Sequence, residues 1–358
     1  MSDIWIYVVG VLSMIFETES LNRMNREIGG FADDLSAALS IKTGITKSYK
    51  HVMICGMGAS AIGGALLVDA MYYSSKISVE VIKTMNLPAW VDEDTLFVAC
   101  SYSGNTYETL QMYKVAVAAG LDVVAVTHGG ELSSLCIQNG TPILMIGGEL
   151  IQPRSALGWF LGILGGIIED AGGPCVRSQL TSLLPHIREY LSEFQADGNY
   201  AYTVAMRIKG KIPVIYGAPN LAAMALRMKT QLNENSKVIA FSGILPEFNH
   251  NEIVGWYEDD QKYSFHPVLV VDDAYEEIAS IIKATKGLLV SRDVDLDVLM
   301  VKGDSVLERN IYAVIFGDYV SLYLAAMREV DPCNVDPIVD IKQRMRDSLS
   351  KKHFKKVM

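Results

Sequence analysis

The amino-acid sequence predicts an α/β protein built from two parallel sheets, each flanked by helices. Short apolar runs of strand length alternate along the chain with longer helical patterns, which is typical of βαβ units. A strand that runs into glycine and then a helix occurs once in each half, at "MICGMGAS" (53–60) and "VIYGAPNL" (214–221). A chain of 358 residues is also long enough to form two hydrophobic cores.

Elements of the first half follow in a regular order. Apolar runs predict strands at 51–55, 78–82, 95–100, 122–127 and 142–146. Helical patterns are centred on 60–73, 105–119 and 155–171. The third pattern is apolar nearly all round, so we expect that helix to be buried between layers.

After "GGPC" (172–175) the pattern starts again. It predicts helices at 177–195, 199–209, 219–233, 275–286 and 305–330, and strands at 212–217, 237–241, 267–271 and 298–302. Two prolines then end the long helix, and the chain finishes in a basic amphipathic helix. The predicted units are an N-terminal extension and helix (1–40), a first domain (41–174), a second domain (175–330) and a tail (331–358).

The first fifteen residues are apolar for about a dozen positions, too short a run for a membrane span. No basic segment precedes them and no clear cleavage site follows, which argues against a secretory signal. We expect a packed extension, with a start at Met14 as the alternative.

Composition narrows the class of protein. Half of the residues are hydrophobic, 20% are charged and the net charge is −10, which disfavours nucleic acid and anionic membranes as partners. Five scattered cysteines without a C-x-x-C pair suit a reducing compartment, so we expect a cytoplasmic protein. Neither H-E-x-x-H nor ligand-spaced His, Cys and acidic residues occur in the sequence, and we expect no metal and no cofactor.

The loop after the first strand permits three interpretations. Gly56-x-Gly58-x-x-Ala61 matches a loose dinucleotide fingerprint, and Glu80 lies near the position of its acidic residue. The glycines could instead serve a tight turn alone. We favour the third interpretation, in which Gly58 and Ser60 contact a substrate.

A second polar loop follows the third strand and supports that interpretation. "SYSGNTYET" places Ser101, Ser103 and Thr106 at the expected start of a helix, in the crevice where ligands of open α/β sheets bind. Hydroxyl donors together with free helix N–H groups make a phosphate site that needs no cation. A capping box at Asn105 or Thr106 is the alternative, but it accounts for one hydroxyl residue and not for three.

This loop resembles the phosphosugar-binding signature of sugar isomerase (SIS) domains. Further motifs occur in the order found in bifunctional phosphoglucose/phosphomannose isomerases. They are "GMGAS" (56–60), "PRSALG" (153–158), "LNENSK" (232–237), "PEFNHNEIVGW" (246–256) and "DP…VDPIVDIK" (331–342). The resemblance covers residues 20 to 345 and implies two SIS domains, each a flavodoxin-like parallel sheet flanked by helices.

The resemblance also implies roles for four residues. Glu234 would move the substrate proton, Arg154 would stabilise the enediolate, and His250 and Lys342 would open the sugar ring. His250 would be contributed across the interface of a homodimer. From the residues alone, other interpretations stay open: a solvated acid at Glu234, a structural histidine at 250, an ion pair at Arg154 and a solvated amine at Lys342.

The predicted function is isomerisation of glucose 6-phosphate and fructose 6-phosphate through a cis-enediolate, with mannose 6-phosphate as a further substrate. The family uses a small hydroxyl residue in the tail to admit the mannose epimer. Residues 331–346 contain no serine or threonine, and Cys333 is the nearest small residue. The alternatives are a non-catalytic SIS protein that senses sugar phosphates and a nicotinamide-dependent oxidoreductase.

Overall fold

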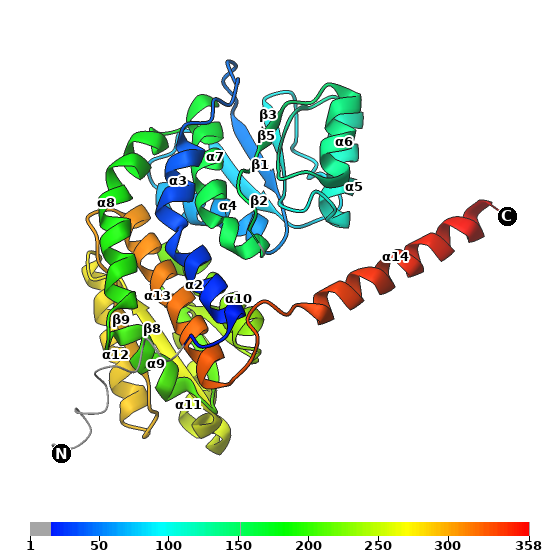
Figure 1. Ribbon diagram of the computed structural model, residues 1–358. Coiled ribbons are helices and arrows are strands. Elements are labelled where there is room, and N and C mark those ends of the chain that lie inside the picture. The colour runs from blue at the N-terminus through cyan, green and yellow to red at the C-terminus, as the bar shows by residue number, and fades with distance from the viewer. Residues whose placement is uncertain (1–15, 151, 358) are drawn as a thin grey trace.

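A computed structural model of the chain describes residues 16–150 and 152–357, with side chains as far as residue 348. The predicted extension at residues 1–15 lies outside the described residues. Two parallel sheets flanked by helices confirm the predicted α/β fold (Figure 1). Each predicted half of the chain contains one sheet.

The first sheet has the strand order β2-β1-β3-β4-β5, which is the order of flavodoxin-like folds. Its strands are β1 (His51–Cys55), β2 (Ser78–Ile82), β3 (Thr95–Ser101), β4 (Asp122–Thr127) and β5 (Ile143–Met145). Buried side chains of α4 (Ala59–Met71) and α7 (Leu157–Asp170) pack on one face of the sheet. Helices α5 (Tyr107–Ala118) and α6 (Gly130–Asn139) cover the other face.

The second sheet repeats this arrangement with four strands in the order β7-β6-β8-β9. These are β6 (Ile212–Gly217), β7 (Phe241–Ile244), β8 (Phe265–Val271) and β9 (Asp297–Met300). Helices α10 (Ala222–Asn235) and α13 (Val306–Met327) pack on one face, and α11 (Glu252–Glu258) and α12 (Glu276–Val290) on the other. Short 3-10 turns lie at η1 (Pro153–Ala156), η2 (Pro219–Leu221), η3 (Glu247–His250) and η4 (Asp260–Ser264).

Helices from both halves form one continuous hydrophobic core. It includes α2 (Glu19–Gly29), α3 (Phe31–Leu39), α8 (Val176–Gln195) and α9 (Tyr200–Ile208) together with α4, α7, α10 and α13. Among the described helices, α13 is long and apolar enough to cross a bilayer, but 89% of its most apolar window is buried inside the protein. It is therefore the central helix of this shared core. The predicted limit between the domains at residues 174 and 175 falls between α7 and α8 and stays a prediction.

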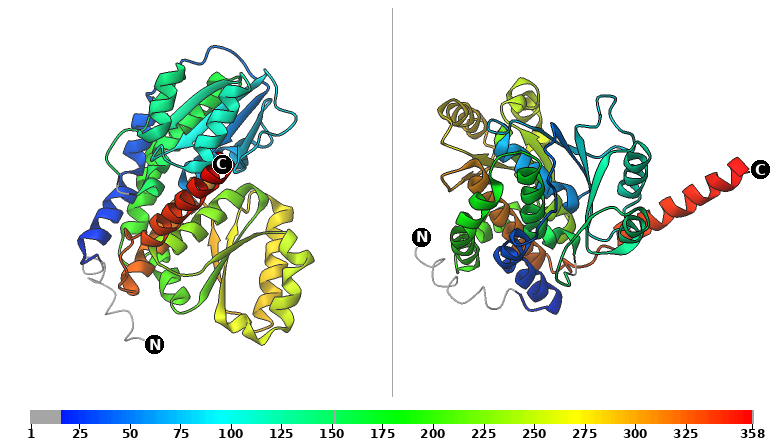
Figure 2. Two further views of the ribbon diagram at one scale, coloured as in Figure 1. Left: turned by 90° about the vertical axis from the view of Figure 1, so that its right-hand side faces the viewer. Right: turned by 90° about the horizontal axis from the view of Figure 1, so that it is seen from above.

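The last helix, α14 (Asp336–Val357), stands apart from this core. It projects away from the body of the molecule in Figure 1 and in the right-hand view of Figure 2. Three apolar side chains on its first turns, Ile338, Val339 and Ile341, are exposed in the single chain.

Local differences from the predicted elements have physical causes. The strand predicted at 237–241 is wrong, since β7 begins at Phe241. Lys237 takes a left-handed conformation with φ of 56°, and the carbonyl of Val238 accepts a hydrogen bond from Asn233 Nδ2 at 2.8 Å instead of pairing in the sheet. The polar segment around His250, for which the sequence predicted neither helix nor strand, contains η3 and α11.

Candidate active site

A cavity of about 440 Å³ opens at the carboxyl ends of β1 and β3, where the strand order of the first sheet reverses direction. Helix α10 of the second half and α14 of the tail complete its wall. Among its lining residues are seven of the predicted site residues: Gly58, Ser60, Ser103, Thr106, Arg154, Glu234 and Lys342. The structure therefore brings together residues from both halves and the tail.

The turn after β1 forms one wall of this cavity. Gly58 has φ of 53°, a left-handed conformation that glycine adopts without strain. A Cβ atom at Gly56 would lie 3.0–3.1 Å from backbone atoms of Ser60 and Cys100, so glycine lets the two strand ends approach. The buried Ser60 hydroxyl accepts a hydrogen bond from the Tyr102 N–H at 3.2 Å, which ties this turn to the loop after β3.

The hydroxyl groups of the second loop form a compact set. Ser101 ends β3 and is buried, and its Oγ lies 3.0 Å from Thr106 Oγ1. Thr106 stands at the N-cap of α5, but its side chain does not bond to the helix backbone. The capping interpretation therefore does not account for this hydroxyl. Ser101 does not line the cavity itself, but its hydroxyl contacts Thr106, which does.

Backbone packing holds this loop in place. Gly104 has φ of 63°, and a Cβ atom there would lie 1.7 Å from the carbonyl oxygen of Gly129. The Gly104 carbonyl accepts a hydrogen bond from the Leu132 N–H at 2.9 Å, and the Ser103 Oγ accepts one from the Asn105 N–H at 3.3 Å. The loop after β3 and the loop after β4 thus form one rigid unit that carries the hydroxyl groups.

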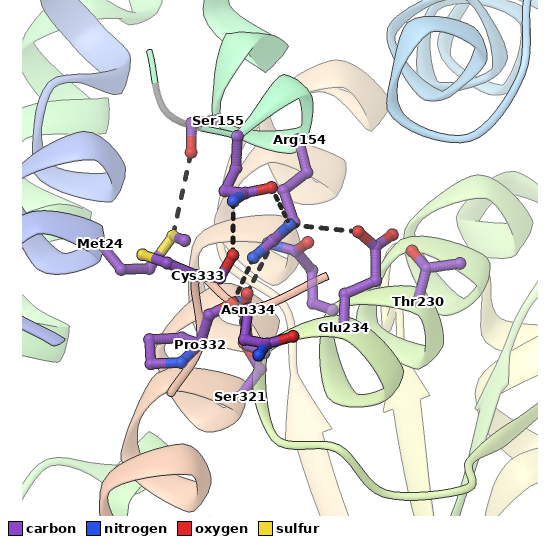
Figure 3. A network of polar contacts seen from close by, with 12 residues as sticks. Met24, Arg154, Ser155, Thr230, Glu234, Ser321, Pro332, Cys333 and Asn334 are labelled. Carbon is purple, nitrogen blue, oxygen red and sulfur yellow. Dashed lines mark hydrogen bonds and ion pairs between the residues drawn. The ribbon is translucent and has the colours of Figure 1, made fainter. Parts of the chain in front are cut away.

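Arg154 is the buried cation of the site, with 3% of its side chain exposed (Figure 3). Its Nη1 donates to Glu234 Oε2 at 3.1 Å, and its Nε donates to Asn235 Oδ1 at 2.7 Å. Burial lowers the pKa of the Arg154 guanidinium, while the nearby Glu234 carboxylate acts in the opposite direction. Glu234 lies in the last turn of α10, lines the cavity and is 30% exposed.

The two residues expected to open the sugar ring lie in different places. Lys342 lines the cavity from α14. His250 ends η3, is exposed and does not line the cavity of its own chain. In the single chain the structure therefore does not bring His250 to Glu234.

Comparison with known proteins places this site in a family. Residues 197–345 match the family model described as the bacterial phospho-glucose isomerase C-terminal SIS domain. A bifunctional phosphoglucose/phosphomannose isomerase from Caldicellulosiruptor bescii is 35% identical over 83% of this chain and 89% of its own length. The protein of the same name from Thermoplasma acidophilum is 33% identical over 90% of this chain and 97% of its own. The chain belongs to the bifunctional phosphoglucose/phosphomannose isomerase family.

The fold of this family member agrees with solved structures. The C-terminal domain of a glucosamine-fructose-6-phosphate aminotransferase from Francisella tularensis superposes with a TM-score of 0.70 at 16% identity. That similarity covers 86% of this chain and 97% of the other, and it confirms the predicted SIS fold.

Membership of the phosphoglucose/phosphomannose isomerase family makes the protein a sugar-phosphate isomerase. It is therefore an enzyme and not the sensing protein considered as an alternative. The oxidoreductase interpretation also loses its acidic residue, because Glu80 pairs with Met53 in the middle of β2 and not at the strand's carboxyl end. Among the described residues, no cluster of three or more His, Cys, Asp or Glu could hold a metal ion.

Three residues that the sequence did not single out surround the isomerase site. Gln152 Oε1 accepts from Arg154 Nη1 at 2.9 Å, Asn235 holds Arg154 Nε, and Lys237 contacts the backbone of Glu234. Asn235 and Lys237 belong to the "LNENSK" motif, which was the one signal for them. Cys333, considered for the mannose epimer, does not line the cavity, and its Sγ lies 3.6 Å from the Ser20 carbonyl oxygen.

Proposed function

We propose that this isomerase interconverts glucose 6-phosphate and fructose 6-phosphate, and also mannose 6-phosphate, by proton transfer between C1 and C2. One observation carries the proposal: a carboxylate, a buried guanidinium and a hydroxyl-rich loop share one cavity. In that cavity Glu234 Oε2 lies 3.1 Å from Arg154 Nη1, and the loop after β3 forms another part of the wall.

Glu234 acts as the base in this proposal. It removes the proton from C2 of the open-chain aldose, the C–H electron pair forms the C1–C2 double bond, and the C1 oxygen takes the negative charge. Return of that proton to C1, with transfer of the O2 proton to the C1 oxygen, yields the ketose. Arg154 stabilises the intermediate, because the charge that leaves Glu234 appears on a substrate oxygen within the same cavity.

Ser103 and Thr106 bind the phosphate of the substrate in this proposal, Ser101 supports the Thr106 hydroxyl from 3.0 Å away, and Gly58 and Ser60 contact the remainder. The positive end of the α5 dipole favours an anion at this point. The proposal requires no metal and no cofactor, and it places the enzyme in the cytoplasm.

Ring opening is assigned to Lys342 and to His250 of the partner subunit in a homodimer. The exposure of His250 and its separation from its own chain's cavity support a role in a second subunit's site. The exposed apolar side chains on α14 also favour burial against another chain.

A coupled assay tests the function. Purified protein is expected to convert fructose 6-phosphate to glucose 6-phosphate at the same rate with and without a chelator. Mannose 6-phosphate is expected to react more slowly, because residues 331–346 contain no serine or threonine and Cys333 does not line the cavity. Loss of all activity with chelator would contradict proton transfer by Glu234 without a metal.

Substitution of the loop hydroxyls tests the phosphate site. Thr106→Val is expected to raise KM about ten- to hundredfold with little change in kcat, since a hydrogen bond to a charged group contributes about 1.5–3 kcal/mol. Ser101→Ala is also expected to raise KM, because it removes the hydroxyl that contacts Thr106 Oγ1. Because the two hydroxyls lie 3.0 Å apart, their effects should not add. The exposed Ser134→Ala is the control, and a normal KM in both site variants would place the phosphate elsewhere.

A further inference from the structure

The segment between α13 and α14 is held by side chains of the body at three consecutive carbonyl groups (Figure 3). The bonds are Arg154 Nη2 to Pro332 O at 2.6 Å, Gln152 Nε2 to Cys333 O at 2.7 Å and Lys237 Nζ to Asn334 O at 2.7 Å. We call Gln152, Arg154 and Lys237 the tail clasp. Residues 328–335 form neither strand nor helix, so these bonds fix a segment that lacks the regular backbone hydrogen bonds of secondary structure.

The ammonium group of Lys237 is fully occupied by backbone oxygens. Its three N–H donors face three carbonyls, those of Glu234, Pro332 (3.3 Å) and Asn334 (2.7 Å). Burial lowers the pKa of Lys237, and the Arg154 charge adds to the effect. Lys237 does not line the cavity. Its amine is therefore arranged to hold backbone and not to exchange protons with a substrate.

The same clasp contacts the base of the reaction. Lys237 binds the Glu234 carbonyl at the C-terminus of α10, where a cation is favourable. Arg154 Nη1 contacts the Glu234 carboxylate and is itself oriented by Gln152 Oε1. One set of three side chains thus contacts Glu234 on one side and the tail on the other.

The tail carries Lys342, whose position depends on how α14 leaves the body. Asn334 Oδ1 accepts a hydrogen bond from the N–H of Asp336, the first residue of α14, at 3.0 Å. Lys342 lies about two turns further along this helix. Since α14 projects from the body, the backbone at residues 332–334 sets its direction (Figure 1).

We propose that Lys237 and Gln152 are positioning residues, which hold the backbone of residues 333 and 334 so that Lys342 stays at the cavity beside Glu234. The proposal rests on the proposed function for the role of Lys342 alone. The effect of the tail clasp on the tail backbone does not depend on that role, and hydrogen exchange measures it separately.

A double-mutant cycle and a hydrogen-exchange measurement test the proposal on the full-length enzyme. Lys237→Met is expected to lower kcat/KM about ten- to hundredfold, the cost of a displacement of about 1 Å in a reacting group. In a Lys342→Ala background the same substitution should cause no further loss. Amides of residues 328–340 should exchange faster in Lys237→Met than in the wild type. Lys237→Arg keeps N–H donors at this position, so it should recover most of the wild-type kcat/KM and most of the slow exchange.

The controls separate this proposal from the proposed function. Lys286→Met, at an exposed position on α12, should change neither activity nor exchange. Independent losses from Lys237→Met and Lys342→Ala, or unchanged exchange at residues 328–340, would overturn the positioning role. If amides of residues 328–340 exchange faster in Lys237→Met but the Lys342→Ala enzyme is fully active, the ring-opening role of Lys342 is refuted. The role of the tail clasp in holding the backbone is then still supported. If Lys237→Met does not fold, Gln152→Leu replaces it in the double-mutant cycle with Lys342→Ala, because Gln152→Leu removes the donor to Cys333 O.

Discussion

Replacing Glu234 with glutamine is expected to lower kcat by about two to four orders of magnitude, the usual cost of losing a positioned proton-transfer group. The substitution keeps the size of the side chain, and its amide oxygen can still accept the hydrogen bond that Arg154 Nη1 donates at 3.1 Å. The amide cannot take up the substrate proton. The loss should therefore appear in kcat, with KM for fructose 6-phosphate changed little.

The control for this substitution is Glu189→Gln, which removes an exposed carboxylate from α8. Its steady-state constants should match those of the wild type. Exchange of the substrate C–H with solvent deuterium gives a second measurement, since proton abstraction at C2 exposes that position to water. A Glu234→Gln enzyme that keeps most of its rate and its exchange would assign proton transfer to another group.

Replacing Arg154 with methionine is expected to affect both catalysis and stability. It removes the cation at the cavity, which should lower kcat about 10²- to 10³-fold, as loss of an oxyanion donor does. It also leaves the buried Asn235 Oδ1 and the buried Gln152 Oε1 without their donor. Each unpaired buried group costs about 1–3 kcal/mol, so the free energy of unfolding in urea should fall by about 3 kcal/mol.

Two comparisons identify the source of the Arg154 effect. Arg154→Lys keeps the charge but loses the planar fork, so it should stay well below the wild type in kcat. Arg188→Met removes an arginine whose ion pair with Asp33 is exposed, and such pairs contribute about 0–1 kcal/mol. An Arg154→Met enzyme with normal kcat would show that the enediolate charge is stabilised elsewhere.

Much of the fold and part of the site follow from local sequence. Alternating apolar runs predicted both sheets, and three hydroxyl residues directly behind one strand predicted a ligand loop at its carboxyl end. Such features are readable because strand, turn and helix N-terminus are neighbours in the chain. The family motifs added Arg154, Glu234 and Lys342, which lie on three separate segments but on one cavity.

The remaining parts of the site depend on contacts between distant residues. Gln152 and Cys333 are separated by 181 positions, Arg154 and Pro332 by 178. Periodicity carries no information on such pairs. The bend at Lys237 was missed for a related reason: "KVIAF" has the composition of a strand, but the lysine is held by tail carbonyls in a left-handed conformation.

The hydrophobic interior that runs unbroken through α4, α7, α10 and α13 restricts how this enzyme can move. Rotation of one sheet against the other would expose apolar side chains of this shared interior to water. Domains that close over a ligand usually avoid this cost, because the interface between them is smaller and more polar. The sugar-phosphate site is therefore preformed and does not depend on closure of one domain over the other. Heating should accordingly melt both sheets in a single calorimetric peak.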